Sequence, residues 1–418
     1  MDLLTLIMVI YLTEVTNMAD TTFFDSKRQL GKDFFVSNDT RATLLNNNDL
    51  VVGATGAGKT RSYVTALLDN ISENMIVVDT KGMLYRKYKA DLKKKGFDIY
   101  RLNLIDGKQS IKYNPLDFVA YNEATKTYNS EDIASLAHTL CPDDMDRFEL
   151  YWVDAARLMI QAMIAFVLEA LPKKEHHIGS VITLFRNWNY QDYDKLFQEH
   201  RLKYPDSYAC IQYDLARNVS ESNKTDSCIR SFVANALACF TANEAIDTFT
   251  GRSDISFADF SDKKMVLFID ISDNDRSRDR IASIFYTQLF QSLIRVADSN
   301  NNGQLGIPLR IIMDDFASNV KVPDLDGKIN VIRSRGICMS IIIQSLKQLA
   351  SIYGADAADN IQNACDHIIY LGSRHDNEYF ARLANMDIYE LIDKLNLHNL
   401  LICERGRSTG IIVPKYNF

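Results

Sequence analysis

The residues at positions 53–60 are Gly53-Ala54-Thr55-Gly56-Ala57-Gly58-Lys59-Thr60, which fits the pattern G-x-x-x-x-G-K-T. The apolar run Leu50-Val51-Val52 precedes this stretch and suits a buried strand, while residues 61–68 follow with apolar spacing that suits a helix. A strand, a glycine-rich loop and a helix in this order predict a phosphate-binding loop of the P-loop type. In such a loop, successive backbone amides surround a phosphate, and the amino end of the helix adds a favourable dipole.

The loop predicts a site for a nucleoside triphosphate, and we take ATP and Mg²⁺ as the cofactors. We expect the Lys59 ammonium to reach the β- and γ-phosphates and the Thr60 hydroxyl to take one Mg²⁺ position. The residues predicted to bind the nucleotide are Gly53, Thr55, Gly56, Ala57, Gly58, Lys59 and Thr60.

The length of 418 residues allows two domains, or one domain that carries a large insertion. Hydrophobic residues make up 47% and charged residues 24%, which is typical of a soluble globular protein. A net charge of −7 argues against a protein coated in nucleic acid, although a local basic channel is compatible with an acidic exterior. The seven cysteines are scattered without a C-x-x-C pair, which favours reduced thiols in a cytosolic compartment.

The amino-terminal segment is short and apolar. Residues 3–12 are apolar, but ten residues in a helix cover only about half of a bilayer core. We interpret residues 1–45 as a lead-in whose apolar start is a remnant of a membrane anchor. A helix packed on the domain, or a start at Met18, explains it equally well. If the segment is an anchor, we expect the protein at the cytoplasmic face of the cell membrane; if it is not, we expect it in the cytoplasm.

Apolar runs that suit buried strands alternate with helical spacing in two parts of the chain. The expected strands are residues 75–79, 98–102, 265–270, 309–315, 336–345 and 367–371, with a terminal hairpin at 400–404 and 410–413. From about 118 to 250 the alternation stops, and residues 131–140, 148–171, 178–188 and 229–240 have helical spacing instead. The pattern predicts an α/β domain at 46–117 and 251–418, with a mostly parallel sheet flanked by helices, and an inserted all-α domain at 118–250.

Two of these strands end in polar residues that could complete a nucleotide site. One ends in Asp314-Asp315, where Asp314 would hold the metal and Asp315 could act as the general base on water. Another ends in Gln344, which could sense the γ-phosphate or orient the attacking water. Between them lie Arg333 and Arg335, and Arg374 follows the next strand. All three are candidates for an arginine that acts in trans, although each could equally pair with a surface carboxylate.

Several motifs together resemble those of the conjugative DNA-transfer ATPases, the coupling proteins of type IV secretion systems, in the TraG-like branch. The resemblance runs from about Asn46 to the end of the chain. Its motifs are the loop 53–60, Val77-Val78-Asp79-Thr80-Lys81-Gly82, Tyr113-Asn114-Pro115-Leu116, Asp314-Asp315-Phe316-Ala317-Ser318, Arg333-Ser334-Arg335-Gly336-Ile337, Ile343-Gln344-Ser345 and Leu371-Gly372-Ser373.

The resemblance implies a RecA-like ATPase domain with an inserted all-α domain, in a membrane-anchored homo-hexamer. It further implies ATP-driven transfer of single-stranded DNA with its relaxase, or of other secreted proteins, to the type IV secretion channel. The all-α domain would recognise the substrate proteins. On this basis Lys59 and Thr60 take the phosphate and Mg²⁺ roles, Asp314 the metal role and Gln344 the γ-phosphate role.

The chain departs from the family pattern at two positions that matter here. Asp315 stands where Glu is usual, and the shorter side chain places its carboxylate about 1 Å further from the water, a misplacement that can cost roughly a hundredfold in rate. Thr80 stands where Pro is usual, and paired membrane helices before the ATPase domain are missing. The motor hypothesis therefore has two alternatives: a nucleotide-gated docking platform with little hydrolysis, and a general double-stranded DNA translocase.

Overall fold

The structure is a computed structural model that describes residues 27–143, 150–219, 223–241, 249–272, 274–316, 320–373 and 375–417. The expected apolar segment at residues 3–12 lies outside these ranges. The chain divides into two compact units. Unit 1 comprises Met1–Ile76, Ile307–Ala317 and Ile329–Phe418, and unit 2 comprises Val77–Gly306 and Ser318–Lys328. Across the described ranges, we find no helix with the length and apolar character needed to cross a bilayer.

The main sheet has nine strands among the described residues, in the order β13-β12-β11-β3-β10-β9-β4-β8-β5. The pairs β3–β10, β10–β9, β11–β3 and β5–β8 are parallel, whereas β12 pairs antiparallel with both β11 and β13. The strands are β3 Asp49–Val52, β4 Asn74–Val78, β5 Asp98–Asn103, β8 Met265–Asp270, β9 Leu309–Met313, β10 Ile337–Ile343, β11 His367–Tyr370, β12 Asn399–Glu404 and β13 Ile411–Pro414. The mostly parallel sheet expected from the sequence is confirmed.

The central strands are mostly apolar because both faces of the sheet are covered, and every residue of β3, β9 and β10 is buried. The polar exceptions are Asp49, Arg310 and Ser340, and Arg310 hydrogen-bonds the other two. Val52 pairs with Ile343 on one side and with Tyr370 on the other. The carboxyl ends of β3, β10 and β11 therefore meet at one edge, where ligands bind in open α/β sheets.

The helix after the β3 loop begins with an unusual turn. It starts as the π-helix η2 Thr60–Val64 and continues as the short α-helix α3 Thr65–Asp69. Single π-turns in helices are often found at functional sites. The other helical elements with residues in unit 1 are α2 Thr40–Thr43, α14 Leu325–Ile332, η5 Arg333–Arg335, α15 Leu346–Tyr353, α16 Ala355–Asn363, α17 Asn377–Leu383 and α18 Ile388–Lys394.

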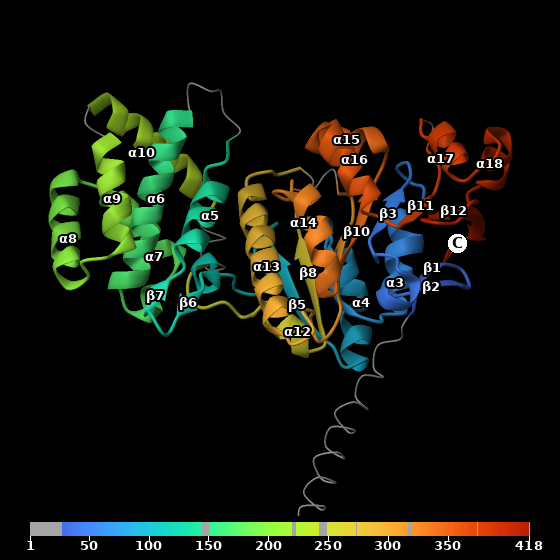
Figure 1. Cartoon of the computed structure of the whole chain (residues 1–418), viewed down its shortest axis with the longest axis horizontal. Helices are drawn as coiled ribbons and strands as arrows, with labels where there is room; N and C mark the ends of the chain where they lie inside the picture. Colours follow the sequence, from blue (N-terminus) through green and yellow to red (C-terminus); the bar gives the residue numbers. More distant parts are fainter. Residues whose placement is uncertain are drawn as a thin grey trace, which may run out of the picture. The chain divides into compact units, whose positions relative to one another are not determined.

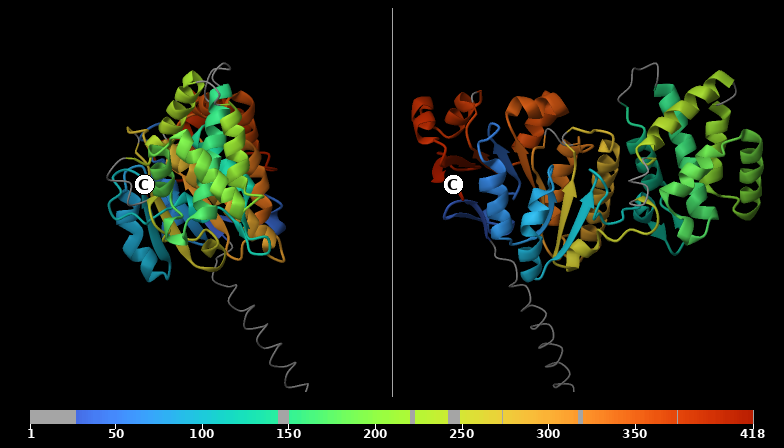
Figure 2. Two further views of the ribbon diagram at one scale, coloured as in Figure 1. Left: turned by 90° about the vertical axis from the view of Figure 1, so that its left-hand side faces the viewer. Right: turned by 180° about the vertical axis from the view of Figure 1, so that it is seen from behind.

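Unit 2 combines strands β5 and β8 with helices on both faces. Helix α13 Asp279–Ser299 lies in front of these strands in Figure 1, and α4 Met83–Lys94 lies on the opposite face, in the view from behind in Figure 2. The remaining elements are η3 Pro115–Phe118, β6 Tyr121–Asn122, β7 Thr127–Tyr128, α5 Ser130–Leu140, α6 Leu150–Ala170, η4 Lys173–Glu175, α7 Ile178–Arg186, α8 Tyr190–Lys203, α9 Tyr208–Val219, α10 Asn223–Ala238 and α12 Asp259–Asp262.

A helical bundle within unit 2 is organised around α6. Helices α5, α7, α9 and α10 all contact α6, whose side chains from Met159 to Leu168 are almost all buried. Four of these helices were expected from the sequence, whereas α8 and α9 were not. Their apolar stripes are narrow: the fully buried side chains of α8 are Tyr193, Phe197 and His200, set in an otherwise polar helix.

The lead-in before β3 contains a hairpin that the sequence did not predict. Strands β1 Lys27–Gly31 and β2 Phe34–Ser37 pair antiparallel, and β1 is buried except at its first residue. Gly31 is packed so closely that a Cβ atom there would lie 2.7 Å from a Val413 methyl group. The hairpin therefore belongs to the core of unit 1.

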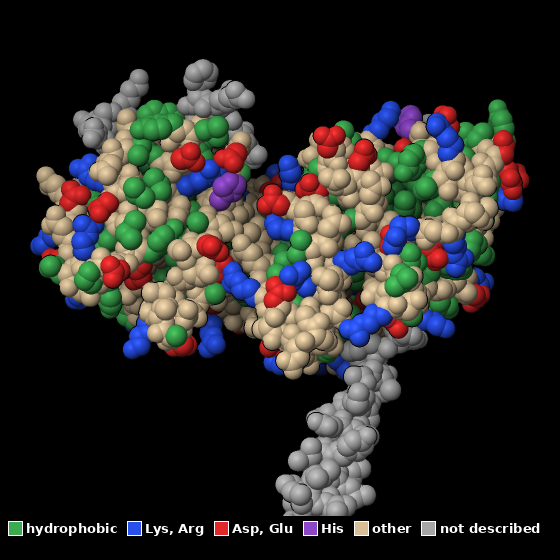
Figure 3. All heavy atoms as spheres, in the orientation of Figure 1, with side chains coloured by type: hydrophobic (Ala, Val, Ile, Leu, Met, Phe, Trp, Pro, Cys, Tyr) green, Lys and Arg blue, Asp and Glu red, His purple; other side chains and the backbone are tan. Residues whose placement is uncertain are grey.

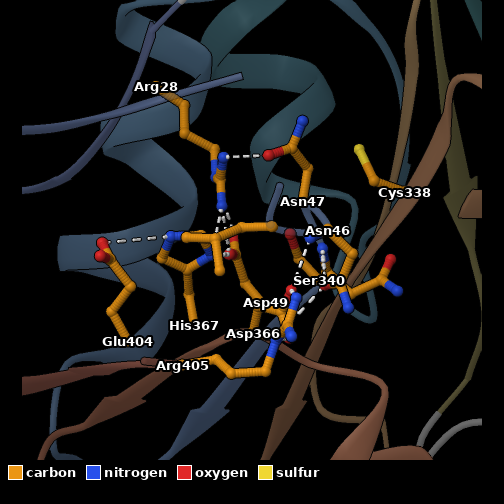
Figure 4. A network of polar contacts seen from close by, with 12 residues as sticks. Arg28, Asn46, Asn47, Asp49, Cys338, Ser340, Asp366, His367, Glu404 and Arg405 are labelled. Atoms are coloured by element: carbon orange, nitrogen blue, oxygen red, sulfur yellow. Dashed lines mark hydrogen bonds and ion pairs between the residues drawn. The ribbon is translucent and has the colours of Figure 1, made fainter. Parts of the chain in front are cut away.

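A buried ionic network joins the hairpin to the amino ends of β3, β9 and β11 (Figure 4). Both oxygens of Asp49 accept hydrogen bonds from Arg28, at 2.7 and 3.0 Å, and one also accepts from Arg310 at 3.1 Å and from the Tyr63 hydroxyl at 2.5 Å. Burial raises the pKa of Asp49, but the two guanidinium groups outweigh it, so that the pKa falls to about 2. Arg310 also bonds Glu73, and both side chains are fully buried.

His367 completes this network in its neutral form. Its Nδ1 lies 3.0 Å from Nη2 of Arg28, a guanidinium nitrogen that can only donate. Burial, followed by the charge of Arg28, lowers the pKa of His367 to about 4. The ring therefore stays uncharged at neutral pH, with Nδ1 as the acceptor.

The described surface mixes charges of both signs. On the face shown in Figure 3, Lys and Arg side chains are interspersed with Asp and Glu over both ends of the molecule. All seven cysteines lie in the described ranges as free thiols, and five of them are buried, in agreement with the expected reduced state.

Candidate functional site

The loop after β3 is tied to both strands that flank it. The Gly53 amide donates to the Ile343 carbonyl at the end of β10, and the Ala54 amide donates to the Gly372 carbonyl after β11. Gly56 and Gly58 have φ angles of +82° and +87°, in the region that favours glycine. A Cβ atom on Gly56 would meet nothing within 4 Å, so this side of the loop is open. The backbone thus forms a cradle with room for a bound group.

The side chain of Lys59 folds over the loop and reaches the carbonyl groups at its start. Its ammonium donates to the Gly53 carbonyl at 2.7 Å and to the Ala54 carbonyl at 3.2 Å. Burial lowers the pKa of Lys59, while the carboxylates of Asp314 and Asp315 act against that shift. The side chain is therefore already positioned over the cradle, held by groups that phosphate oxygens could replace.

Thr60 and Asp314 form the second part of the site. The Thr60 hydroxyl donates to Oδ2 of Asp314 at 2.5 Å, and Oδ1 of Asp314 accepts from the Asp315 amide at 3.0 Å. Burial raises the pKa of Asp314, and the hydrogen bond from Thr60 opposes that shift. A hydroxyl and a carboxylate oxygen are the hard ligands that Mg²⁺ prefers, so this pair fits a magnesium ion beside the loop.

Gln344 connects the loop to the second acidic residue. Its Oε1 accepts from the Thr55 hydroxyl at 3.1 Å, and its Nε2 donates to Oδ1 of Asp315 at 3.3 Å. The side chain of Gln348, in the first turn of α15, accepts a hydrogen bond from the Gln344 amide at 3.0 Å. The sequence did not single out Gln348, although its position four residues after Gln344 places it on the following helix.

Asp315 has an unusual backbone conformation. Its φ angle is +50°, a left-handed conformation that Asp tolerates better than most non-glycine residues. The next amide, that of Phe316, donates to the Ile342 carbonyl of β10 and ends the strand pairing. The motif continues into Ala317 and Ser318, which lie outside the described residues.

The two predicted arginines are placed at the other end of β10. Arg333 and Arg335 form the short helix η5 before the strand, whereas Gln344 follows it. A strand of seven residues covers roughly 23 Å, so neither guanidinium approaches the loop of its own chain. Arg335 donates to the Val331 carbonyl, and Arg333 lines a cavity of about 360 Å³ with Asp366 and others. Arg374, also considered from the sequence, lies outside the described residues.

Asp79, at the end of β4, serves a local role. Its carboxylate accepts from the Met83, Leu84 and Tyr85 amides at 2.7–3.1 Å and so caps α4. The polar residues after β4 therefore begin a helix, as the strand–helix alternation predicts.

These features define a class of protein. A phosphate-type loop after β3, an acidic pair after β9 and a glutamine after the intervening β10 are the parts of a P-loop protein with a RecA-like fold. The chain belongs to the family described as type IV secretory system conjugative DNA transfer, whose family model matches residues 12–386. The resemblance found in the sequence is confirmed.

Relatives and solved structures agree with this placement. VirD4 from Agrobacterium fabrum is 23% identical over 334 residues, which cover 79% of this chain and 48% of VirD4. The chain thus spans about half the length of the curated relatives it matches. The bacterial conjugative coupling protein TrwBdeltaN70, in its unbound form, superposes with a TM-score of 0.67 at 17% identity, covering 94% of this chain and 89% of the TrwBdeltaN70 chain.

TrwB in complex with ADP and Mg²⁺ gives a TM-score of 0.65 at 16% identity, with the same coverage of both chains. At this level of identity the likeness concerns the fold, and it confirms the expected RecA-like P-loop domain with a helical insertion.

Proposed function

We propose that this chain is the motor of a coupling protein, which binds ATP with Mg²⁺ at the loop 53–60 and hydrolyses it to move conjugative DNA. The observation that carries the proposal is the convergence of Lys59, Thr60, Asp314 and Gln344, from three separate segments after β3, β9 and β10, on one edge of the sheet. Membership of the conjugative DNA transfer family supports the substrate class. The complex of TrwB with ADP and Mg²⁺ supports the choice of cofactors.

Each residue would have a defined part in nucleotide binding. The backbone amides of the loop would hold the β-phosphate, since the positive φ angles of Gly56 and Gly58 allow successive amides to turn toward one bound group. The Lys59 ammonium would exchange the Gly53 and Ala54 carbonyls for phosphate oxygens. Thr60 and Asp314 would hold Mg²⁺, which when bound neutralises the charge that develops on the phosphates.

Asp315 and Gln344 would act on the attacking water. Asp315 would accept the proton from the water as general base, and Gln344 would orient that water or sense the γ-phosphate. Because Gln344 bonds both Thr55 and Asp315, a change in the loop on binding is transmitted directly to the position of the base.

The proposal extends to assembly and partners. A homo-hexamer at the cytoplasmic face of the membrane would place Arg333 or Arg335 of one subunit near the nucleotide of the next, because neither reaches its own loop. The domain 46–117 and 251–418 would drive single-stranded DNA to the type IV secretion channel. The all-α domain at 118–250 would bind the relaxase or other secreted proteins.

Asp315 favours one alternative, a nucleotide-gated docking platform that hydrolyses ATP slowly. Its side chain is one methylene shorter than Glu, its backbone is left-handed, and its carboxylate is engaged by Gln344. These features would hold the base back from the water and lower turnover without lowering affinity.

The deciding experiment measures ATPase activity against protein concentration, with and without single-stranded DNA. A steep rise with concentration, further stimulation by the DNA, and loss of activity in Lys59→Ala are the results we expect of the motor. A preference for double-stranded DNA would indicate a general translocase instead. Absence of turnover under every DNA and oligomer condition, with ATP binding intact, would leave the docking platform.

A further inference from the structure

A buried lysine near the carboxyl terminus contacts the loop from outside. The Lys415 side chain is 2% exposed, and its ammonium donates to the Ala57 carbonyl at 3.0 Å and to the Leu397 carbonyl at 3.0 Å. Residues 57 and 415 are separated by 358 positions in the sequence. Burial of a lysine ammonium is costly unless hydrogen-bond acceptors compensate for the water that it loses, and both carbonyls contribute to this compensation.

The segment that carries Lys415 is held in place on several sides. The Lys415 amide donates to the His398 carbonyl at 2.7 Å, continuing the pairing of β13 with β12. The preceding Pro414 carbonyl accepts from the Lys32 amide of the β1–β2 hairpin at 2.8 Å. Tyr416 then donates its hydroxyl to Asp69 at the end of α3. The lysine is therefore delivered to the loop by a fixed backbone.

The contacted carbonyl belongs to the peptide that joins Ala57 to Gly58, within a glycine-rich part of the loop. Ala57 lies between Gly56 and Gly58, and both glycines have positive φ angles. Glycine rotates between φ regions at low cost, so this peptide plane needs an outside contact to fix its direction. In a trans peptide, the C=O of one residue and the N–H of the next point in opposite directions. Holding the Ala57 carbonyl toward Lys415 therefore directs the Gly58 amide to the opposite side of the peptide plane.

We infer that Lys415 is a positioning residue of the nucleotide site: it fixes the peptide 57–58 so that the Gly58 amide is presented to the phosphates. The inference rests on the proposed function, since it assigns Lys415 to the same ATP site. In this account the carboxyl-terminal strand β13 and the residue after it complete the nucleotide site, although the sequence motif ends at Thr60. Lys415 acts on the loop backbone, and the nucleotide is contacted by the loop.

The test compares Mg²⁺·ATP affinity, by titration calorimetry, in the full chain and three variants. Lys415→Met keeps the length of the side chain and removes the cation, and we expect it to bind about tenfold more weakly, equivalent to about 1.4 kcal/mol. Tyr416→Phe is the matched control, because it removes a hydrogen bond from the same segment without touching the loop. Lys59→Ala reports whether the loop is the ATP site at all.

The variants distinguish a failure of the inference about Lys415 from a failure of the proposed function. If the natural chain binds ATP and Lys59→Ala does not, the proposed site is correct, and Lys415→Met can then be judged alone. Affinity within twofold of the natural chain in Lys415→Met overturns the inference, and so does an equal loss in Tyr416→Phe, which would indicate a general packing effect. If Lys415→Met does not fold, Lys415→Arg serves instead: it keeps the cation, and we expect an affinity within about twofold of that of the natural chain. A loss of about tenfold or more in Lys415→Arg would contradict the inference, because the cation would still be present.

Discussion

Replacing Asp315 with Glu tests whether a short base limits the motor. The substitution adds one C–C bond, about 1.5 Å, and so moves the carboxylate forward by roughly 1 Å or more along the side chain. A misplacement of that size can cost roughly a hundredfold in rate, so Asp315→Glu should raise turnover by as much as about a hundredfold, equivalent to about 2.7 kcal/mol of activation free energy. ATP affinity should not change, because the loop and the Thr60–Asp314 pair remain intact.

The structure also predicts a cost that the assay must separate from the gain. At a φ angle of +50°, Glu is less well tolerated than Asp, which we expect to lower stability by up to about 1 kcal/mol. Turnover is therefore measured well below the melting temperature, by steady-state phosphate release with single-stranded DNA present. Asp315→Asn is the control, because it keeps the size of the side chain and removes the base, and it should reduce turnover. An unchanged or lower rate in Asp315→Glu, with ATP still bound, would refute the argument from side-chain length.

Three further predictions concern the core and the loop. Arg28→Met leaves Asp49 buried with fewer partners and should cost about 3–5 kcal/mol of stability, measured by denaturant unfolding, while adding Asp49→Asn should recover part of the loss. The pKa of His367 is about 4 in the folded chain, below its value of about 6.5 in the unfolded chain. Between pH 6.5 and 4 the unfolded chain therefore binds a proton that the folded chain does not, and the free energy of unfolding decreases as the pH decreases. Between pH 7 and 5 the natural chain should lose about 2 kcal/mol that His367→Gln does not lose, visible as a smaller drop in melting temperature. Gly53→Ala would place a Cβ atom 2.9 Å from the Cβ atom of Leu371, and it should weaken ATP binding about tenfold or more in a titration. Gly327→Ala is the control: a Cβ atom there would meet nothing within 4 Å, so ATP binding should not change.

The sequence predicted those parts of the fold whose pattern is complete within one short segment of the chain. The loop 53–60 and the buried strands are recognisable because their patterns lie within ten residues, and the polar ends of β9 and β10 follow from strand direction. Helices α8 and α9 were not predicted because their buried positions include polar or small residues: His200 in α8, and Gln212 with Ala209 and Ala216 in α9. The sequence placed the first apolar strand at Leu50–Val52, yet the preceding Asp49 is the first residue of β3 and is fully buried.

The remaining features of the site depend on contacts between distant segments. No local pattern around Lys415 connects it with Ala57, since the contact depends on how β13 is placed beside β12. Arg333 and Arg335 remain predicted candidates for an arginine that acts in trans, and only the direction of β10 shows that they lie at the opposite edge of the sheet from Gln344. Tertiary placement of this kind has no periodicity for a sequence pattern to report.

The buried ionic network has a consequence for how this protein can change over evolution. Arg28, Arg310, Asp49 and Glu73 form one buried cluster of two positive and two negative charges beside the uncharged His367, and the loss of any single charge leaves another without compensation. A lone substitution at one of these positions should therefore be selected against, whereas joint replacement by apolar residues of similar volume should be tolerated. Across relatives, we expect the five positions to be kept or exchanged as a group, with the hairpin at residues 27–37 inherited together with the strands to which it is bound.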